Sequence, residues 1–113
     1  MSDTNVTIQS PDFPEACCTL DIDGAEQDRL IAMFKALGNP TRFAIMKYLV
    51  THPGCITGDI VDVLPLAQST VSQHLKVLRQ AGLIEGEVEG PATSYCLNET
   101  GLVWFREKVG DIF

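Results

Sequence analysis

The stretch PLAQSTVSQHLKVLRQAGLIEGEVEG, residues 65–90, contains a change of hydrophobic period that decides the fold. In its first part Val71, Leu75 and Leu78 recur at i, i+4 and i+7, the spacing of one side of an α-helix. Gly82 suits the position just beyond the end of such a helix. The residues after it predict two strands, about 84–88 and 93–97, with a turn between them. The stretch therefore predicts a helix followed at once by a β-hairpin.

The rest of the chain surrounds this stretch with further helices. TGDIVDVLP, residues 57–65, predicts a short helix capped by Thr57, and a tight turn separates it from the longer one. Two helices are predicted within 26–40 and 39–52, and another within 98–113, where Asn98 is the expected cap. The expected inward face of the second helix consists of Phe43, Ile45, Met46 and Leu49. The predicted fold class is mainly α with a small β-hairpin, a winged helix-turn-helix.

Charge divides the chain of 113 residues into two parts. The net charge is −7, and residues 1–28 hold seven of the fifteen acids and no Lys or Arg. We interpret residues 1–24 as a flexible acidic arm that carries the adjacent Cys17 and Cys18, and residues 25–113 as the folded domain. Residues 63–84 contain no acid, whereas Lys76 and Arg79 lie among them. The helix that precedes the hairpin is therefore locally basic.

The side of this helix that faces away from the apolar stripe is polar. Ser69, Gln73, Lys76 and Gln80 share it, and such side chains can reach base edges and phosphates in a major groove of DNA. The same residue types are common on any solvated helix face. The positions around the helix therefore leave open whether this face contacts DNA or is simply solvated. The last helix is rich in apolar residues and is therefore expected to pack against a partner surface. These residues are Leu102, Val103, Trp104, Phe105 and Val109.

Two segments, MFKALGNPTRFAIMKYL (33–49) and STVSQHLKVLRQAGL (69–83), resemble the ArsR family of metal- and metalloid-responsive repressors. The resemblance covers residues 30–98. It implies a homodimeric winged helix-turn-helix whose first and last helices form the interface, and it implies operator DNA as the partner. Residues 68–81 would be the recognition helix. The positions that match DNA-contacting ones are Gln68, Ser69, Thr70, Ser72, Gln73, His74 and Lys76. For His74, at the edge of the apolar stripe, a packed residue that braces the helix is the alternative.

The cysteines suggest what such a repressor would sense. Adjacent Cys17 and Cys18 have Cα atoms only about 3.8 Å apart, too close for an unstrained disulfide. Arsenic-sensing relatives often carry C-V-C at the start of the helix before the turn. Here CITGDI matches it at Cys55, with Thr57 in place of the second cysteine. Three thiolates from Cys17, Cys18 and Cys55 suit As(III) or Sb(III) as the inducer, and no organic cofactor is expected.

Other uses of these thiols remain open. A repressor of the same fold that responds to Cd, Pb or Zn is one, although zinc prefers four ligands. A redox switch is another. Cys96, next to Tyr95 in a strand, is interpreted as a small buried hydrophobic residue. A thiol enzyme is disfavoured because the chain has no C-x-x-C motif and no histidine placed by sequence beside the pair.

The remaining expectations concern location and the hairpin. No apolar stretch approaches the about 18 residues that span a bilayer, and residues 1–15 do not resemble a secretion signal. We therefore expect a cytoplasmic protein with no membrane partner. In the family the tip of the hairpin often carries Arg or Lys. The hairpin of this chain instead carries Glu85, Glu87 and Glu89. Such a wing should add little DNA affinity, or should hold its acids away from the duplex.

Overall fold

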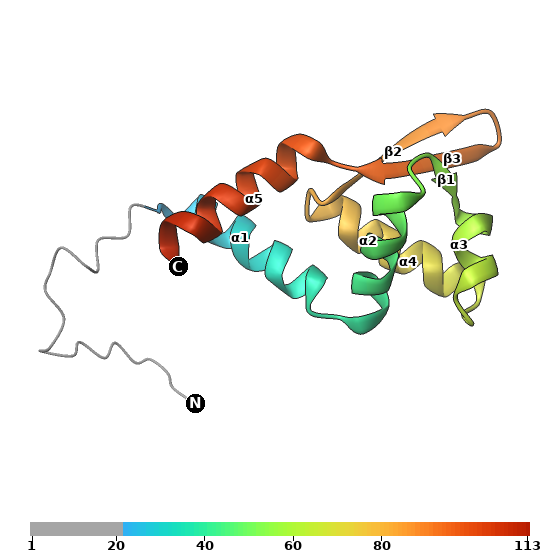
Figure 1. Cartoon of the computed structure of the whole chain (residues 1–113), viewed down its shortest axis with the longest axis horizontal. Coiled ribbons are helices and arrows are strands. Elements are labelled where there is room, and N and C mark those ends of the chain that lie inside the picture. Colours follow the sequence, from blue (N-terminus) through green and yellow to red (C-terminus); the bar gives the residue numbers. More distant parts are fainter. Residues whose placement is uncertain (1–21) are drawn as a thin grey trace, which may run out of the picture.

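A computed structural model describes residues 22–113 and confirms the predicted fold class. Its elements are α1 (Gly24–Leu37), α2 (Pro40–Thr51), β1 (Cys55–Ile56), α3 (Thr57–Val63), α4 (Gln68–Gln80), β2 (Ile84–Glu89), β3 (Ala92–Leu97) and α5 (Glu99–Ile112). Helices α3 and α4 with their short turn form the helix-turn-helix, and β2 and β3 form the wing (Figure 1). None of the described helices has the length and apolar character needed to cross a membrane. The predicted arm lies almost wholly outside the described residues, and so do Cys17 and Cys18.

The helix ends follow the sequence with one exception. Asn39 Oδ1 accepts hydrogen bonds from the N–H groups of Thr41 and Arg42, and Asn98 Oδ1 accepts one from Gly101 N–H, so both predicted caps are confirmed. The prediction that Thr57 caps α3 is wrong. The helix begins one residue earlier than a Thr57 cap requires, and Asp59 Oδ2 accepts instead from Ile56 N–H at 3.0 Å.

The sheet has one strand more than the predicted hairpin. Its order is β1-β3-β2, all antiparallel, with Cys55 opposite Tyr95 and Ile84 opposite Leu97. Strand β1 was not predicted because two residues are too few to show a hydrophobic period, and its partner strand lies some forty positions further along the chain. The addition matters because β1 fixes Cys55 in the sheet.

One core joins the helices to the sheet. It includes Met33, Ile45, Leu49, Ile60, Val71, Leu75, Leu78, Leu83 and Ile84, each at most 1 % exposed. Phe43, expected to face inward, is 53 % exposed, so that prediction is wrong. Residues 43 and 47 lie one helical turn apart, and both are exposed on the outer side of α2, opposite Ile45 and Leu49.

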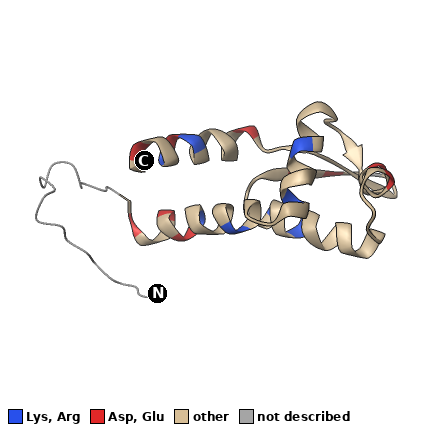
Figure 2. Cartoon of the chain, turned by 60° about the horizontal axis from the view of Figure 1, so that its bottom comes forward, with Lys and Arg blue, Asp and Glu red and all other residues tan. Residues whose placement is uncertain are grey.

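Helices α1 and α5 pair with each other at the end of the molecule away from the wing (Figure 1). The rings of Phe34 and Phe105 meet edge to face with centroids 5.2 Å apart. Charged residues of both signs occur along the two helices (Figure 2), and Lys108 Nζ lies 3.2 Å from Glu26 Oε2. Even so, Ile31, Phe34 and Val103 remain 46 %, 42 % and 41 % exposed. The pair therefore presents an uncovered apolar surface.

Candidate nucleic-acid interface

Helix α4 is held by one side and offers the other to solvent. Val71, Leu75 and Leu78 are buried as predicted, and Gly82, with φ of 83°, follows the end of the helix. Six of the seven predicted DNA-contacting side chains are exposed: Gln68, Ser69, Thr70, Ser72, Gln73 and Lys76. The structure thus brings them onto one accessible, acid-free surface at the start and middle of the helix.

His74, the seventh predicted residue, occupies a different environment. It is half-buried, and its Nδ1 lies 3.3 Å from Nη1 of Arg42 on α2. Burial first, and then the Arg42 guanidinium, lower the pKa of His74. This geometry is that of a side chain held between two helices.

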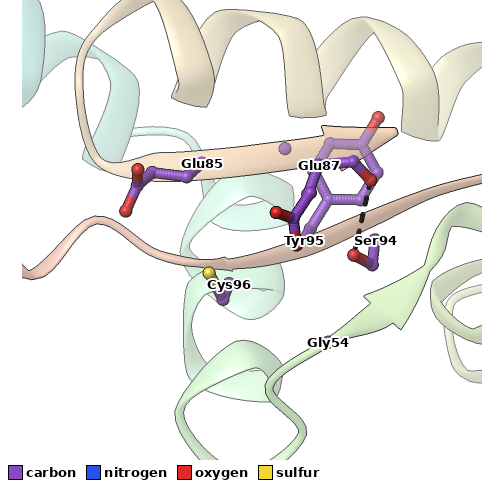
Figure 3. Close-up of a pocket in the computed structure, with 7 residues that line it drawn as sticks. Gly54, Glu85, Glu87, Ser94, Tyr95 and Cys96 are labelled. Carbon is purple, nitrogen blue, oxygen red and sulfur yellow. Dashed lines mark hydrogen bonds between the residues drawn. The ribbon is translucent and has the colours of Figure 1, made fainter. Parts of the chain in front are cut away.

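The wing separates Glu85 and Glu87 from α4. Paired residues on neighbouring antiparallel strands point to the same side of a sheet, and successive residues alternate. Glu85 is paired with Cys96 and Glu87 with Ser94, so these four share one side (Figure 3). On the other side, a Cβ at Gly86 would lie 3.2 Å from Nη1 of Arg79 on α4. Glu85 and Glu87 therefore lie on the side of the sheet that faces away from α4.

A polar cavity lies where the wing meets the helix-turn-helix. Its volume is about 340 Å³, and Thr57, Gln68, Ser72 and Thr93 are among its lining residues. Gln68 and Ser72 belong to the predicted DNA-contacting set, whereas Thr57 and Thr93 were not predicted. Strand alternation places Thr93 with Tyr95, on the α4 side of the sheet, which is the one signal in the sequence that could have found it. The cavity extends the uncharged hydrogen-bonding surface of α4 toward the wing.

The described cysteines lie in contrasting places. Cys55 is 7 % exposed in the core, and burial first and then Asp59 raise the pKa of its thiol. Cys96 is exposed, so its interpretation as a buried hydrophobic residue is wrong. It lines a cavity of about 450 Å³ together with Glu85, Glu87 and Ser94 (Figure 3). Within residues 22–113 no three His, Cys, Asp or Glu side chains gather as a metal site would require. Since residues 22–113 contain two of the four cysteines, three sulfurs from one chain would have to include Cys17 or Cys18.

This chain is similar in sequence to known regulators of transcription. Residues 39–85 match the family described as "Bacterial regulatory protein, arsR family". An uncharacterized HTH-type transcriptional regulator of Methanocaldococcus jannaschii, MJ1325, is 35 % identical over 68 residues, 60 % of this chain and 76 % of that protein. The arsenical resistance operon repressor of Bacillus subtilis is 36 % identical over 66 residues, 58 % of this chain and 63 % of its own length.

Among solved structures, the fold resembles the homodimeric winged helix-turn-helix DNA-binding domain Mb0332 of Mycobacterium bovis. The TM-score is 0.65 at 23 % identity, over 81 % of this chain and 86 % of that one. The proteins similar in sequence are thus regulators of transcription, and this structural neighbour shares the fold.

Proposed function

Because the chain belongs to the arsR family of bacterial regulatory proteins, we propose that it is a homodimeric repressor that binds operator DNA and releases it on binding As(III) or Sb(III). The observation that carries the DNA-binding part is the exposed, acid-free polar side of α4, opposite the buried stripe. A helix supported in this way enters a major groove with its N-terminal half against the bases.

Each polar side chain of α4 has a role that its chemistry suits. Gln68 and Gln73 carry amides of the kind that pair with adenine, and the hydroxyls of Ser69, Thr70 and Ser72 bond to bases or phosphates. Lys76 is the cation for a phosphate. Because the surface holds few cations, the affinity should depend on salt less steeply than for proteins that make many phosphate contacts.

The substitution Gln73→Ala tests the reading of bases. We expect specific operator affinity to fall by about 1–3 kcal/mol, because a bidentate amide–base pair is lost, while affinity for unrelated DNA stays unchanged. Gel-shift titration with the promoter of the protein's own operon and with scrambled DNA measures both. Phe43→Ala, which truncates an exposed uncharged side chain on α2, is the control and should leave both affinities as they are. An equal loss on both DNAs would remove Gln73 from the reading set.

The dimer part of the proposal is supported by the uncovered apolar surface of α1 and α5. Ile31, Phe34 and Val103 are more exposed than residues of their type usually are, and they lie on two helices that pack together. A two-fold partner would cover this surface with its own copy of it. Two α4 helices would then face half-sites about one helical turn, roughly 34 Å, apart.

The inducer part is supported by the chemistry of Cys55 and by its connection to α4. Arsenous acid reacts with three thiols by exchanging each As–O bond for an As–S bond, and each thiol proton leaves with the hydroxyl as water. A raised thiol pKa therefore does not oppose capture of As(III), whereas a divalent ion must expel the proton. The short strand β1, which begins with Cys55, is directly followed by α3, and α3 packs on α4. Capture of Cys55 by an ion held on Cys17 and Cys18 would therefore displace α3, which supports α4, the helix proposed to read the operator.

Cysteine-to-serine variants test the site. Arsenite should lower operator affinity of the wild type by about 5–150-fold, the usual range of such coupling. Cys17→Ser, Cys18→Ser and Cys55→Ser should each abolish this response and leave basal operator binding intact. Cys96→Ser, at the exposed thiol, is the matched control and should respond like the wild type. A full response from Cys55→Ser would rule out the three-sulfur site.

The pH dependence separates As(III) from the divalent alternatives. Between about pH 6 and 8, release by As(III) should change little, because no net proton is displaced. Release by Cd(II) should strengthen by up to tenfold per pH unit for each proton expelled. For Cys55 this gain should continue above the ordinary thiol pKa of about 8.5, because its pKa is raised. Release by peroxide, reversed by a thiol reductant, would instead favour the redox switch.

A further inference from the structure

One side chain on α2 connects two of the helices that the proposed function uses, α1 and α4. Arg42, in the first turn of α2, donates from Nε to the Ala36 carbonyl at 2.8 Å and from Nη2 to the Lys35 carbonyl at 3.3 Å. Both carbonyls belong to the last turn of α1. The third nitrogen, Nη1, lies 3.3 Å from Nδ1 of His74 on α4. The guanidinium thus joins the end of α1, the start of α2 and the middle of α4.

The identity of the donor fixes the state of the histidine. A guanidinium has N–H donors only and keeps its proton at any physiological pH, so Nδ1 of His74 must be the acceptor. His74 is therefore neutral and carries its proton on Nε2. The lowered pKa of His74 agrees with this state.

This hydrogen bond constrains α4 in a way that its apolar contacts do not. Val71, Leu75 and Leu78 hold the helix by burial, which is non-directional and tolerates small rotations about the helix axis. A hydrogen bond from a fixed guanidinium is directional and weakens steeply when its angle changes. The guanidinium is itself fixed, because two carbonyls of α1 hold its other nitrogens.

We propose that Arg42 is a positioning residue for operator recognition, which sets the rotation of α4 relative to α1 through its hydrogen bond to His74. The inference rests on the proposed function and adds to it a residue outside the reading surface. Because α1 belongs to the proposed dimer surface, the bond relates each reading helix to the two-fold axis. A rotation of α4 would swing the side chains of both reading helices away from their half-sites.

A double-mutant cycle with two operators tests the proposal. The variants are Arg42→Gln, His74→Leu and their combination. One operator has native half-site spacing and the other has one inserted base pair. Each single variant should bind the native operator about tenfold more weakly and should discriminate less between the two spacings. The double variant should be no weaker than either single one, because all three lack the same bond. Lys47→Gln, an exposed position on α2, controls for the lost charge and should discriminate like the wild type.

Two further measurements keep the test decisive if Arg42→Gln folds poorly. His74→Asn places an amide oxygen near the Nδ1 position and should recover most of the affinity that His74→Leu loses. Nitrogen-15 NMR of the histidine rings, without DNA, should show His74 as the neutral Nε2–H tautomer in the wild type. In Arg42→Lys, which keeps the charge but not the planar group, this signature should be disturbed.

Each contrary result has a distinct meaning. Additive losses from Arg42→Gln and His74→Leu would show two independent DNA contacts and overturn the inference. A lower melting temperature with unchanged operator affinity and unchanged spacing discrimination would overturn it as well, because the bond would then serve stability alone. If the wild type binds no operator, the proposed function fails and the inference fails with it. The NMR signature would still report the bond, so the two failures are distinguishable.

Discussion

Alanine in place of Phe34 should convert the proposed dimer into monomers at micromolar concentration. Phe34 is 42 % exposed although it packs on Phe105, so its outer edge is free to enter a partner surface. Truncating an aromatic anchor typically costs at least about 2 kcal/mol, and a two-fold interface loses the anchor from both subunits. The expected total of about 4 kcal/mol raises the dimer dissociation constant roughly a thousandfold. Sedimentation velocity over a concentration series measures it.

Phe43→Ala provides the matched control for this prediction. Phe43 is 53 % exposed on α2, so the same ring is removed from a surface that is no less accessible. The control should remain dimeric. If Phe43→Ala dissociates the dimer and Phe34→Ala does not, the interface lies on α2 and the assignment to α1 and α5 is wrong.

Alanine at Gly101 should lower the free energy of unfolding by about 2–4 kcal/mol, in spite of its better helix propensity. Propensity favours alanine by at most about 1 kcal/mol in a helix interior. Against this, Gly101 is buried at the start of α5, and its Cβ would collide with the backbone carbonyl of Gly82. Overpacking costs about 1–3 kcal/mol. A shift of α5 would also break the 3.0 Å bond from Asn98 N–H to the Leu83 carbonyl and disturb the Asn98 cap, each worth about 1 kcal/mol.

Gly110→Ala makes the same substitution in the same helix, where a Cβ meets nothing within 4 Å. It should stabilise the protein slightly or leave it unchanged. Denaturant unfolding at one fixed protein concentration compares the two variants, because a dimer's apparent stability depends on concentration. Equal effects of Gly101→Ala and Gly110→Ala would show that α5 does not rest on the turn after α4.

The sequence predicted those parts of the fold that local chemistry determines. The stripe of Val71, Leu75 and Leu78, the caps at Asn39 and Asn98 and the hairpin after Gly82 each depend on residues within a few positions of one another. The same holds for the polar side of α4, whose exposure follows once the opposite side is buried. The structure therefore confirms the exposure of the six polar positions, and the contacts they make with DNA stay predictions.

The features that were missed depend on partners far along the chain. Strand β1 forms because residues 55 and 56 pair with β3. Two residues are too few to show the alternating pattern by which a strand is predicted from sequence. Phe43 has an apolar side chain at a plausible spacing, but the core lies on the other side of α2. Cys96 was judged by its neighbour Tyr95, although alternation places the two on opposite sides of the sheet. The bond between Arg42 and His74 spans 32 positions and could only be seen once α2 and α4 were placed together.

If the chain binds DNA through α4 as proposed, the two sides of the wing would help it to reject wrong encounters with the duplex. Glu85 and Glu87 line the side that faces away from α4, and the whole chain carries a net charge of −7. A duplex that approached the back of the wing would meet these carboxylates and be repelled, whereas one that approached α4 would meet a segment, residues 63–84, that contains no acid. Repulsion between like charges in the wrong orientation favours the productive orientation, even when the productive orientation gains no extra attraction. An acidic repressor would in this way bind a polyanion in one orientation only.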